Sequence, residues 1–506
     1  MRANPLVRSV VAVAGIGCGT ISAHATDWLQ FGFDPAHSGN NPSETILSAS
    51  GTGEFALTAL FPIYNVTLPD VADGAPAFLS SVTTANGVRD LLFLETKDGH
   101  VLALDAATGA TVWSHATKPT PPPAGQDYTT SSPAIDPNRQ YVYFYGLDGN
   151  AHKYAVGTGL ETSSGGWPER ATLKPDVEKG SSALAIAIAK SGTTYLYVAN
   201  GGYPGDGGDY QGHVTAIDLA TGAQNVFNAN CSDQSVHFVE FPATPDCSEV
   251  QTAIWARPGV IYSAAKDRIF MATGNGTYDP VNHDWGDSVF ALNPNGTGSG
   301  GNPVDSYTPT NFQSLQNGDT DLGSTAPAIL PSTLAGYPNL AVQGGKDAML
   351  RLLNLDNLSG NTPPGPGHTG GELQSINVPQ GGEVFAQPAV WVDSSGTTWV
   401  FVATGNGVSG LTLGLNNTTH KPALTKVWQN STGGSTPVVA NDVLYYFSGS
   451  INALNPKTGA LLWSDSSPGG VHWESPIVVN GRVYITDQNG RLWAYALDGI
   501  FKNGFE

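Results

Sequence analysis

The sequence has few charged residues, and basic residues are the scarcer kind. Charged residues make up 13% of the 506, and 42 acidic against 22 basic residues give a formal net charge of −20. Nucleic acids and anionic lipids both require a cationic surface, so we do not expect this chain to bind either of them. No apolar run reaches the length of a bilayer, and we predict no membrane-spanning segment.

Cysteine is also scarce, with three in the chain. One of them, Cys18, lies close to the N-terminus, which leaves Cys231 and Cys247 as an even pair. In an exported protein such a pair predicts one disulfide, here closing the loop 231–247. The Cys-x-x-Cys-His motif that attaches a c-type haem is missing, so we expect no haem in this chain. Ser-His-Asp order, phosphate-binding loops and zinc-ligand spacing are missing as well, which removes the commonest sequence signals of hydrolases, nucleotide-binding proteins and zinc enzymes.

The N-terminus has the three parts of a secretory signal. Arg2 and Arg8 are basic, residues 9–21 are apolar or small, and Ala23-His24-Ala25 forms a small-x-small cleavage site. This pattern predicts a signal peptide over 1–25 and a periplasmic or secreted mature protein.

Turn residues are abundant, with 62 glycines and 35 prolines, and helical apolar stripes are missing. Residues 99–113, GHVLALDAATGATVW, describe a β-hairpin with an Asp and a Gly at its turn. Related hairpins recur at 214–227, 289–296, 451–463 and 492–499. Recurring Pro-containing starts, such as APAFL at 75–79, mark the first strand of each unit.

Each repeat therefore contains four antiparallel strands, the unit of a propeller blade. We predict an all-β, eight-bladed β-propeller with blades at 72–115, 128–167, 180–228, 254–297, 322–360, 382–429, 433–464 and 472–499. The last blade lacks an outer strand, and we predict that the apolar segment 54–64 supplies it and closes the ring. The propeller then spans 26–499 as one domain, followed by a short tail at 500–506. We expect a monomer.

Two motifs resemble a known superfamily. The pattern Ala-x-Asp-x-x-Thr-Gly-x-x-x-Trp of 103–113 and the opening WLQFGFDPAHSGNN of 28–41 are similar to motifs of the PQQ-type eight-bladed propellers. That superfamily includes quinoprotein alcohol dehydrogenases and also cofactor-free scaffolds of outer-membrane protein assembly. In the dehydrogenases a flat quinone lies at the propeller axis on a Trp, a Ca²⁺ held by an Asn and a Glu polarises it, and an Asp acts as base.

The resemblance assigns roles to several residues of this chain. Segment 253–276 is similar to the family's floor segment, with Trp255 at the stacking Trp and Asn275 at the metal-binding Asn. Segment 318–330 is similar to the one with the catalytic Asp, which points to Asp321 or Asp319. Lys346 stands at the position of a basic residue that contacts the quinone.

Two departures from the family pattern weigh against an enzyme. Tyr203 and Pro204 stand where the family has its metal-binding Glu, and Asp206 is only a loose substitute. The adjacent cystine that covers the quinone in many of these enzymes is missing. The candidate residues also have ordinary structural interpretations: Trp255 can be interblade packing, and Asn275 lies in a Gly-Asn-Gly turn that recurs at 405–407.

Another group of candidates stands outside the family's own list. Phe385, Gln387, Trp473 and Glu474 come immediately before predicted inner strands and should point toward the axial funnel. We expect Gln387 and Trp473 to contact a ligand there.

Two functions follow from these observations. The first is an exported oxidoreductase that binds PQQ and Ca²⁺ and acts on a small alcohol. The second is a non-catalytic propeller that binds a protein or glycan of the cell envelope. Whether the protein is an enzyme stays open at the level of sequence, because fold alone does not determine function.

Overall fold

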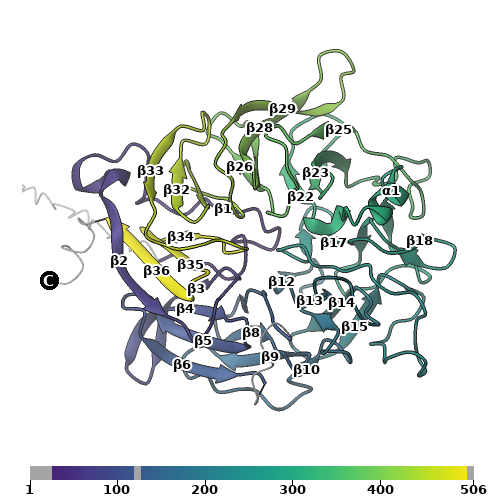
Figure 1. Ribbon diagram of the computed structural model, residues 1–506, viewed down its shortest axis with the longest axis horizontal. Helices are drawn as coiled ribbons and strands as arrows, with labels where there is room; N and C mark the ends of the chain where they lie inside the picture. Colours follow the sequence, from purple (N-terminus) through teal and green to yellow (C-terminus); the bar gives the residue numbers. More distant parts are fainter. Residues whose placement is uncertain (1–24, 119–126, 498–506) are drawn as a thin grey trace, which may run out of the picture.

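The computed structural model of the protein describes residues 25–118 and 127–497. Most of the predicted signal peptide and the whole predicted tail lie outside these residues. Eight β-sheets follow one another around a ring, as the view down the ring in Figure 1 shows. Over these two ranges, no helix has the length and apolarity needed to cross a membrane.

The first four blades follow the predicted order. Blade 1 contains β3 (Ala77–Thr84), β4 (Gly87–Glu95), β5 (His100–Asp105) and β6 (Thr111–Ala116). Blade 2 contains β7 (Ala134–Ile135), β8 (Tyr141–Tyr145), β9 (Asn150–Ala155) and β10 (Glu169–Arg170). Blade 3 contains β12 (Ala185–Ile188), β13 (Thr194–Gly202), β14 (His213–Asp218) and β15 (Gln224–Asn228), and β11 (Glu178–Lys179) also pairs with β13. Blade 4 contains β16 (Ile261–Ser263), β17 (Arg268–Ala272), β20 (Val289–Leu292) and β21 (Asp305–Tyr307).

The remaining blades complete the ring. Blade 5 contains β22 (Ala328–Pro331), β23 (Asn339–Gly344), β24 (Met349–Asn354) and β25 (Gln374–Asn377). Blade 6 contains β26 (Ala389–Val392), β27 (Thr398–Thr404), β28 (Gly407–Leu415) and β29 (Pro422–Gln429). Blade 7 contains β30 (Val438–Ala440), β31 (Val443–Phe447), β32 (Ile451–Leu454) and β33 (Leu461–Asp465). Blade 8 contains β34 (Ile477–Val479), β35 (Arg482–Asp487) and β36 (Arg491–Leu497).

A strand from the N-terminal region forms the outer edge of blade 8. β2 (Leu60–Thr67) runs antiparallel to β36, with Leu60 opposite Leu497 and Thr67 opposite Arg491. Figure 1 shows the purple β2 beside the yellow β36, so the two ends of the chain share one sheet. This strand begins six residues later than the predicted segment 54–64, because Gly53–Phe55 (η1) and Leu57–Ala59 (η2) form 3₁₀ turns.

The interblade contacts follow from the hairpin sequence. Asp105 Oδ1 accepts the backbone N–H of Ala107 at 2.8 Å, and Gly109 has a φ of +73°. This geometry is the one the Asp and Gly of the repeat favour. The hairpin directs Trp113 toward blade 2, where its indole N–H donates to the carbonyl of Val156 at 2.9 Å. Trp113 is therefore a structural contact between blades.

Two long segments between the predicted blades contain outer strands. β21 lies within 297–320 and β25 within 361–381, and each pairs with the third strand of its blade. The first of these segments also contains the short helix α1 (Phe312–Asn317). Strands of three or four residues carry no alternation long enough to detect, so only the partner strand defines them.

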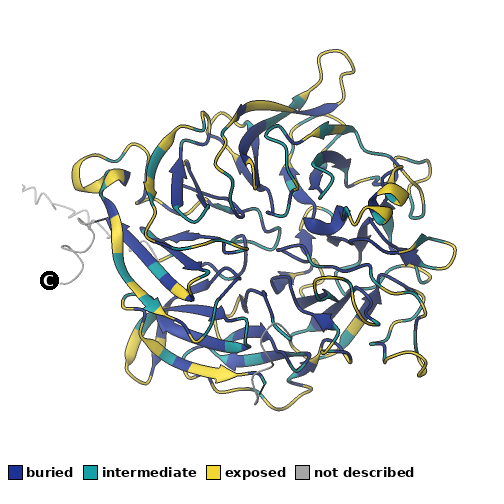
Figure 2. Cartoon of the chain, viewed as in Figure 1, coloured by how far each residue is buried: buried dark blue, intermediate teal, exposed yellow. Residues whose placement is uncertain are grey.

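An N-terminal segment crosses the middle of the ring. Residues 28–41 bond to the inner strands of seven blades, through Phe78, Ile135, Ile186, Tyr262, Val390, Val439 and Val478. Within it, β1 (Asn40–Asn41) runs parallel to β30. Trp28 and Phe31 are almost completely buried, and Figure 2 shows the inner part of the ring in the buried colour. This segment joins the blades at the axis.

Candidate functional site

The residues that precede the inner strands meet around one cavity near the axis. The inner strands all run in the same direction around the ring, so the residues before them gather at one end of the axis. A cavity of about 370 Å³ lies there. Its lining comes from blades 2 to 6 and 8 and includes Tyr128, Thr130, Lys179, Ser181, Tyr203, Pro204, Asp206, Trp255, Arg257, Asn275, Asp319, Asp321, Lys346, Phe385, His472 and Trp473.

Three aromatic rings form an apolar part of this cavity. The ring centre of Trp255 lies 6.0 Å from that of Phe385 and 6.3 Å from that of Trp473. Phe385 and Trp473 meet edge to face at 5.5 Å. Aromatic rings in this arrangement present broad apolar surfaces to a planar ligand. Trp255 thus lines the cavity, as the resemblance implies, and Phe385 and Trp473 join it there.

Asp321, Asn275 and Lys346 form the polar centre of the site. Asp321 Oδ1 accepts the backbone N–H of Asn275 at 2.8 Å, and Asp321 Oδ2 lies 2.8 Å from Lys346 Nζ. The same ammonium lies 3.5 Å from Asp319 Oδ1 and 5.4 Å from the centre of the Trp255 ring. The residues assigned by resemblance from three separate segments therefore line one cavity.

A glycine makes this close packing possible. A Cβ on Gly274 would lie 3.0 Å from Cγ of Asp321 and 3.1 Å from the indole nitrogen of Trp255. In the second copy of the Thr-Gly-Asn-Gly sequence, a Cβ on Gly405 would meet nothing within 4 Å. The two copies share a turn, and only the first one packs against a carboxylate.

The side chains of Asp206 and Asn275 lie close together, although the two residues are far apart in the sequence. Asp206 Oδ2 is 3.4 Å from the side-chain Nδ2 of Asn275, and Tyr210 donates to Asp206 Oδ1 at 2.6 Å. Tyr203 and Pro204, which replace the family's Glu, also line the cavity. Carboxylate and amide oxygens are the ligands that a hard cation prefers, and Asp206, Asn275 and Asp321 offer such oxygens here.

Burial raises the pKa of two carboxyl groups at or near the site. Burial raises the pKa of Asp321, and the Lys346 ammonium offsets part of that rise. Although partial burial opposes it, the carboxylates of Asp321 and Asp319 raise the pKa of Lys346. Burial, together with the negative charge of Asp321, raises the pKa of the nearby Asp287 to about 8. An acid whose pKa moves toward neutrality is suited to exchange protons.

Two cationic residues of the cavity were missed by the sequence analysis. Lys179 ends β11 in blade 3, and Arg257 lies two residues after Trp255 in blade 4. The guanidinium of Arg257 donates to the carbonyl of Thr130 at 2.6 Å and to the carbonyl of Ser181 at 3.0 Å. The position of Arg257 two residues after Trp255 was the one available signal for it.

Two sequence candidates lie outside the cavity lining. Gln387 is buried between blades 5 and 6, where its Oε1 accepts the backbone N–H of Ala326 at 3.2 Å. Glu474 is completely buried and accepts the backbone N–H of His472 at 2.6 Å. Both side chains therefore connect structural elements behind the cavity, and a contact between Gln387 and a cofactor stays a prediction.

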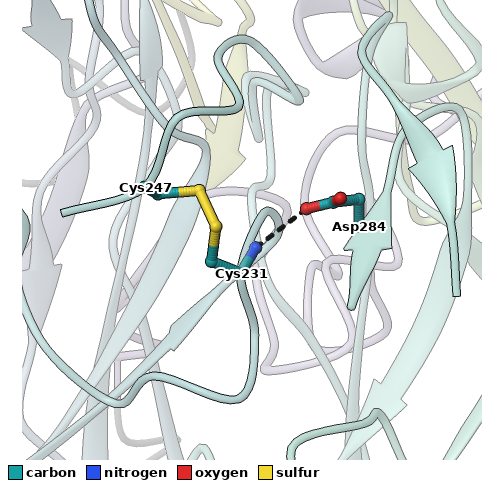
Figure 3. Close-up of side chains that lie close together, drawn as sticks. All are labelled: Cys231, Cys247 and Asp284. Atoms are coloured by element: carbon teal, nitrogen blue, oxygen red, sulfur yellow. Dashed lines mark hydrogen bonds between the residues drawn. A yellow bond between two sulfur atoms is a disulfide. The ribbon is translucent and has the colours of Figure 1, made fainter. Parts of the chain in front are cut away.

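The predicted disulfide is confirmed. Cys231 and Cys247 are bonded with their Cα atoms 6.0 Å apart, as Figure 3 shows. The nearby Asp284 accepts the backbone N–H of Cys231 at 2.9 Å. The three side chains lie close enough together to suggest metal ligands, but both sulfur atoms are engaged in the disulfide. The cluster holds the 231–247 insertion against the β19 hairpin arm (Asp284–Trp285).

The donor set fits a planar anionic ring system with a hard cation. The aromatic group supplies a stacking surface, and Asp206, Asn275 and Asp321 supply oxygen atoms near Trp255. Arg257 is 2% exposed, and its Nε has no hydrogen-bond partner in the part of the chain that the structure describes. A buried donor of this kind is costly unless a ligand engages it.

The fold and the axial cavity define the class of this protein. The chain is an eight-bladed β-propeller, as predicted, with a cavity where the inner strands begin. A PQQ-repeat family model described as outer membrane protein assembly factor BamB matches residues 74–228 and 415–501. These ranges cover blades 1 to 3 and 7 to 8, together with the end of blade 6. A search of the curated proteins gave no match.

Solved structures of quinoprotein enzymes share the fold. A quinohemoprotein alcohol dehydrogenase from Comamonas testosteroni matches with 15% identity and a TM-score of 0.62, covering 94% of this chain and 81% of that one. The quinohemoprotein alcohol dehydrogenase ADHIIG from Pseudomonas putida HK5 matches with 14% identity and a TM-score of 0.61, covering 94% and 80%. A europium-containing methanol dehydrogenase matches with 14% identity and a TM-score of 0.59, covering 93% and 98%.

Proposed function

We propose that the protein is an exported oxidoreductase that binds PQQ and a hard cation such as Ca²⁺ in its axial cavity and oxidises a small alcohol. The observation that carries this proposal is the convergence of Trp255, Asn275, Asp321 and Lys346 from blades 4 and 5 on one cavity. All four residues lie in 229–414, between the two ranges that the BamB family model matches, whereas Asp206 and Trp473 lie within those ranges.

Each residue has a physical role in this function. Trp255 gives a planar ligand a stacking surface, and Phe385 and Trp473 exclude water beside it. Asp206, Asn275 and Asp321 offer oxygen atoms for a cation. When bound, the quinone would accept the two electrons of alcohol oxidation, with its carbonyl polarised by the cation.

Asp321 is the group suited to take the hydroxyl proton of the alcohol. Its Oδ1 is held by the Asn275 N–H, and its Oδ2 lies against Lys346, so the carboxylate has a fixed direction. The raised pKa increases its basicity relative to a solvated carboxylate. Asp319 is largely exposed and contacts Lys346 at 3.5 Å, so we assign the proton transfer to Asp321.

The test is a titration of the purified mature protein with PQQ, with and without Ca²⁺, followed by absorbance and calorimetry. We expect saturable binding at micromolar concentrations, strengthened by Ca²⁺ and weakened by Trp255→Ala. Loaded protein should then reduce an artificial electron-accepting dye when a primary alcohol is added. Absence of saturable PQQ binding to well-folded protein would overturn the proposal.

A non-catalytic scaffold is the second candidate. The observation that favours it is the match of five blades to a family model described as outer membrane protein assembly factor BamB. In this function the loops and rim of the propeller bind an envelope protein or a glycan. Cross-linking in intact cells, followed by purification of the tagged protein, tests it. Recovery of one envelope protein in equal amounts with the protein, together with no PQQ binding, would favour the scaffold over the enzyme.

A further inference from the structure

Two basic side chains, Lys179 and Arg257, line the axial cavity, and neither forms an ion pair with an acidic side chain among the residues that the structure describes. Lys179 is 5% exposed, and within residues 25–118 and 127–497 its ammonium forms no ion pair. Its Nζ lies 4.0 Å from the centre of the Tyr128 ring. Arg257 is bound to backbone carbonyls on one side, while its Nε has no partner among the same residues.

The nearest carboxylates do not neutralise these cations. Asp73 Oδ2 is engaged by Lys97 at 2.9 Å and by His472 at 2.8 Å. Burial and the proximity of Asp73 raise the pKa of Glu474, which weakens its negative charge near neutral pH. The third cation of the cavity, Lys346, is paired with Asp321. Lys179 and Arg257 are thus uncompensated in a chain whose net charge is −20.

An uncompensated buried charge is unfavourable unless a partner of opposite sign occupies the space in front of it. Both side chains line the same cavity, next to Thr130 and Ser181. The Lys179 ammonium and the free Nε–H of Arg257 are both donors that an ionised carboxylate accepts. We propose that Lys179 and Arg257 form a carboxylate-binding subsite of the axial cavity, which holds a carboxylate group of a small planar ligand.

The subsite rests on the proposed function, because both use the same cavity. It adds a second pair of residues that would recognise the ligand. Lys179 and Arg257 come from blades 3 and 4, while Asp321 and Lys346 come from blade 5. A ligand carboxylate at the first pair would orient the remainder of the ligand across Trp255 toward Asp321. The carboxylate comes either from the quinone cofactor, which carries several, or from a substrate that is a hydroxy acid.

The pKa of Lys179 also supports the subsite. Burial lowers the pKa of Lys179 to about 7, and the positive charge of Arg257 contributes in the same direction. Lys97 also lowers this pKa, whereas Asp73 raises it. A bound carboxylate favours the charged ammonium, so binding above neutral pH takes up a proton and the affinity falls as the pH rises through this range.

The experiment uses the mature protein and benzene-1,3,5-tricarboxylate, a planar carboxylate without redox chemistry. Calorimetry should show binding to the wild type, and Lys179→Met should weaken it by about tenfold or more, the usual loss for a charged hydrogen bond. Lys153→Met is the matched control, because Lys153 also lies over a tyrosine ring, 4.3 Å from Tyr141, but outside this cavity. Benzene-1,3,5-tricarboxamide controls for shape without charge.

The outcomes distinguish the subsite from the proposed function. Tricarboxylate binding that is lost in Lys179→Met and kept in Lys153→Met supports the subsite even when PQQ does not bind. Equal affinity in wild type and Lys179→Met, equal affinity for the neutral amide, or no tricarboxylate binding overturns it, even when PQQ binds. Circular dichroism and thermal melting verify folding, and Lys179→Gln serves if Lys179→Met does not fold.

Two further titrations identify the source of the carboxylate. Weaker PQQ binding in Lys179→Met assigns the carboxylate to the cofactor. Unchanged PQQ binding, with loss of preference for glycolate over ethylene glycol in dye reduction, assigns it to the substrate.

Discussion

The backbone N–H of Asn275 in blade 4 donates a 2.8 Å hydrogen bond to Oδ1 of Asp321 in blade 5. This bond crosses the boundary between two blades and leaves Oδ2 of Asp321 to Lys346. The direction of the carboxylate therefore depends on a turn of the neighbouring blade. Asn275 therefore lies in a turn and also orients Asp321 through its backbone N–H, while its role as a metal ligand stays a prediction.

Asp321→Asn should separate binding from chemistry. Asparagine keeps the shape and can still accept the Asn275 N–H, but it cannot take a proton. We expect PQQ binding within a few-fold of wild type and dye reduction lowered by about 10²-fold or more, the usual contribution of a general base. Stopped-flow dye reduction measures this. Asp319→Asn is the matched control and should retain most activity; the reverse order of effects would assign the base to Asp319.

Gly274→Ala should disturb the site through packing alone. Its Cβ would press against Asp321 and Trp255 at 3.0 and 3.1 Å, so one of them must move. We expect PQQ binding to weaken by about tenfold, since displaced groups lose their alignment with a ligand. Gly405→Ala makes the same change in the second copy of the turn, where the space is open. Equal behaviour of the two variants in calorimetry would show that the contact is unimportant.

Asp287→Asn should make stability less dependent on pH. Burial raises the pKa of Asp287 from its ordinary value of 3.8 to about 8. Between these two values the folded state holds a proton that the unfolded state has lost, so wild-type stability falls as the pH rises. The variant lacks this ionisation. Its free energy of unfolding, relative to wild type, should therefore increase by about 1 kcal/mol or more between about pH 5 and pH 8.5.

Urea unfolding at the two pH values measures this difference for Asp287→Asn. Asp356→Asn provides a control at a half-exposed ion pair with Lys266. If the difference in free energy of unfolding between Asp287→Asn and wild type stays constant with pH, Asp287 ionises normally in the folded protein.

Removal of the disulfide should lower stability without abolishing the ring. Cys231 and Cys247 are separated by 16 positions, and closing a loop of this length contributes about 3 kcal/mol in the chain-entropy model. We expect the double variant Cys231→Ser/Cys247→Ser to unfold at a lower urea concentration with a similar far-ultraviolet spectrum. A reductant should shift the wild type to the same midpoint and leave the variant unchanged. A reductant effect on the variant would point to another cause.

The ring could be predicted from the sequence because its signals are local. An Asp and a Gly at the turn of 99–113 define a hairpin wherever it occurs, and repetition then defines the blade. The strands β21 and β25 could not be predicted, since they are short and their pairing depends on a neighbour distant in the sequence. β2 also begins later than predicted, because the 3₁₀ turns before it leave no periodic pattern in the sequence.

The site was only partly predictable. Four candidates lie in segments that resemble family motifs, and the structure places them around one cavity: Trp255, Asn275, Asp321 and Lys346. Lys179 and Arg257 could not be predicted as site residues, because their burial in the cavity depends on how several blades enclose the axis. Gln387 occupies the expected place before an inner strand, yet its side chain turns to Ala326. Position along a strand predicts proximity to the axis, and packing decides where the side chain points.

The axial segment 28–41 has a consequence for synthesis. Ribosomes produce it before almost all of its partners, which extend from Phe78 in blade 1 to Val478 in blade 8. The backbone groups of this segment therefore lack their final hydrogen bonds until the last blade has been synthesised. The centre cannot form blade by blade, so assembly of the whole ring becomes one late event. Until the final strands are made, the unfinished chain exposes apolar surface that favours aggregation.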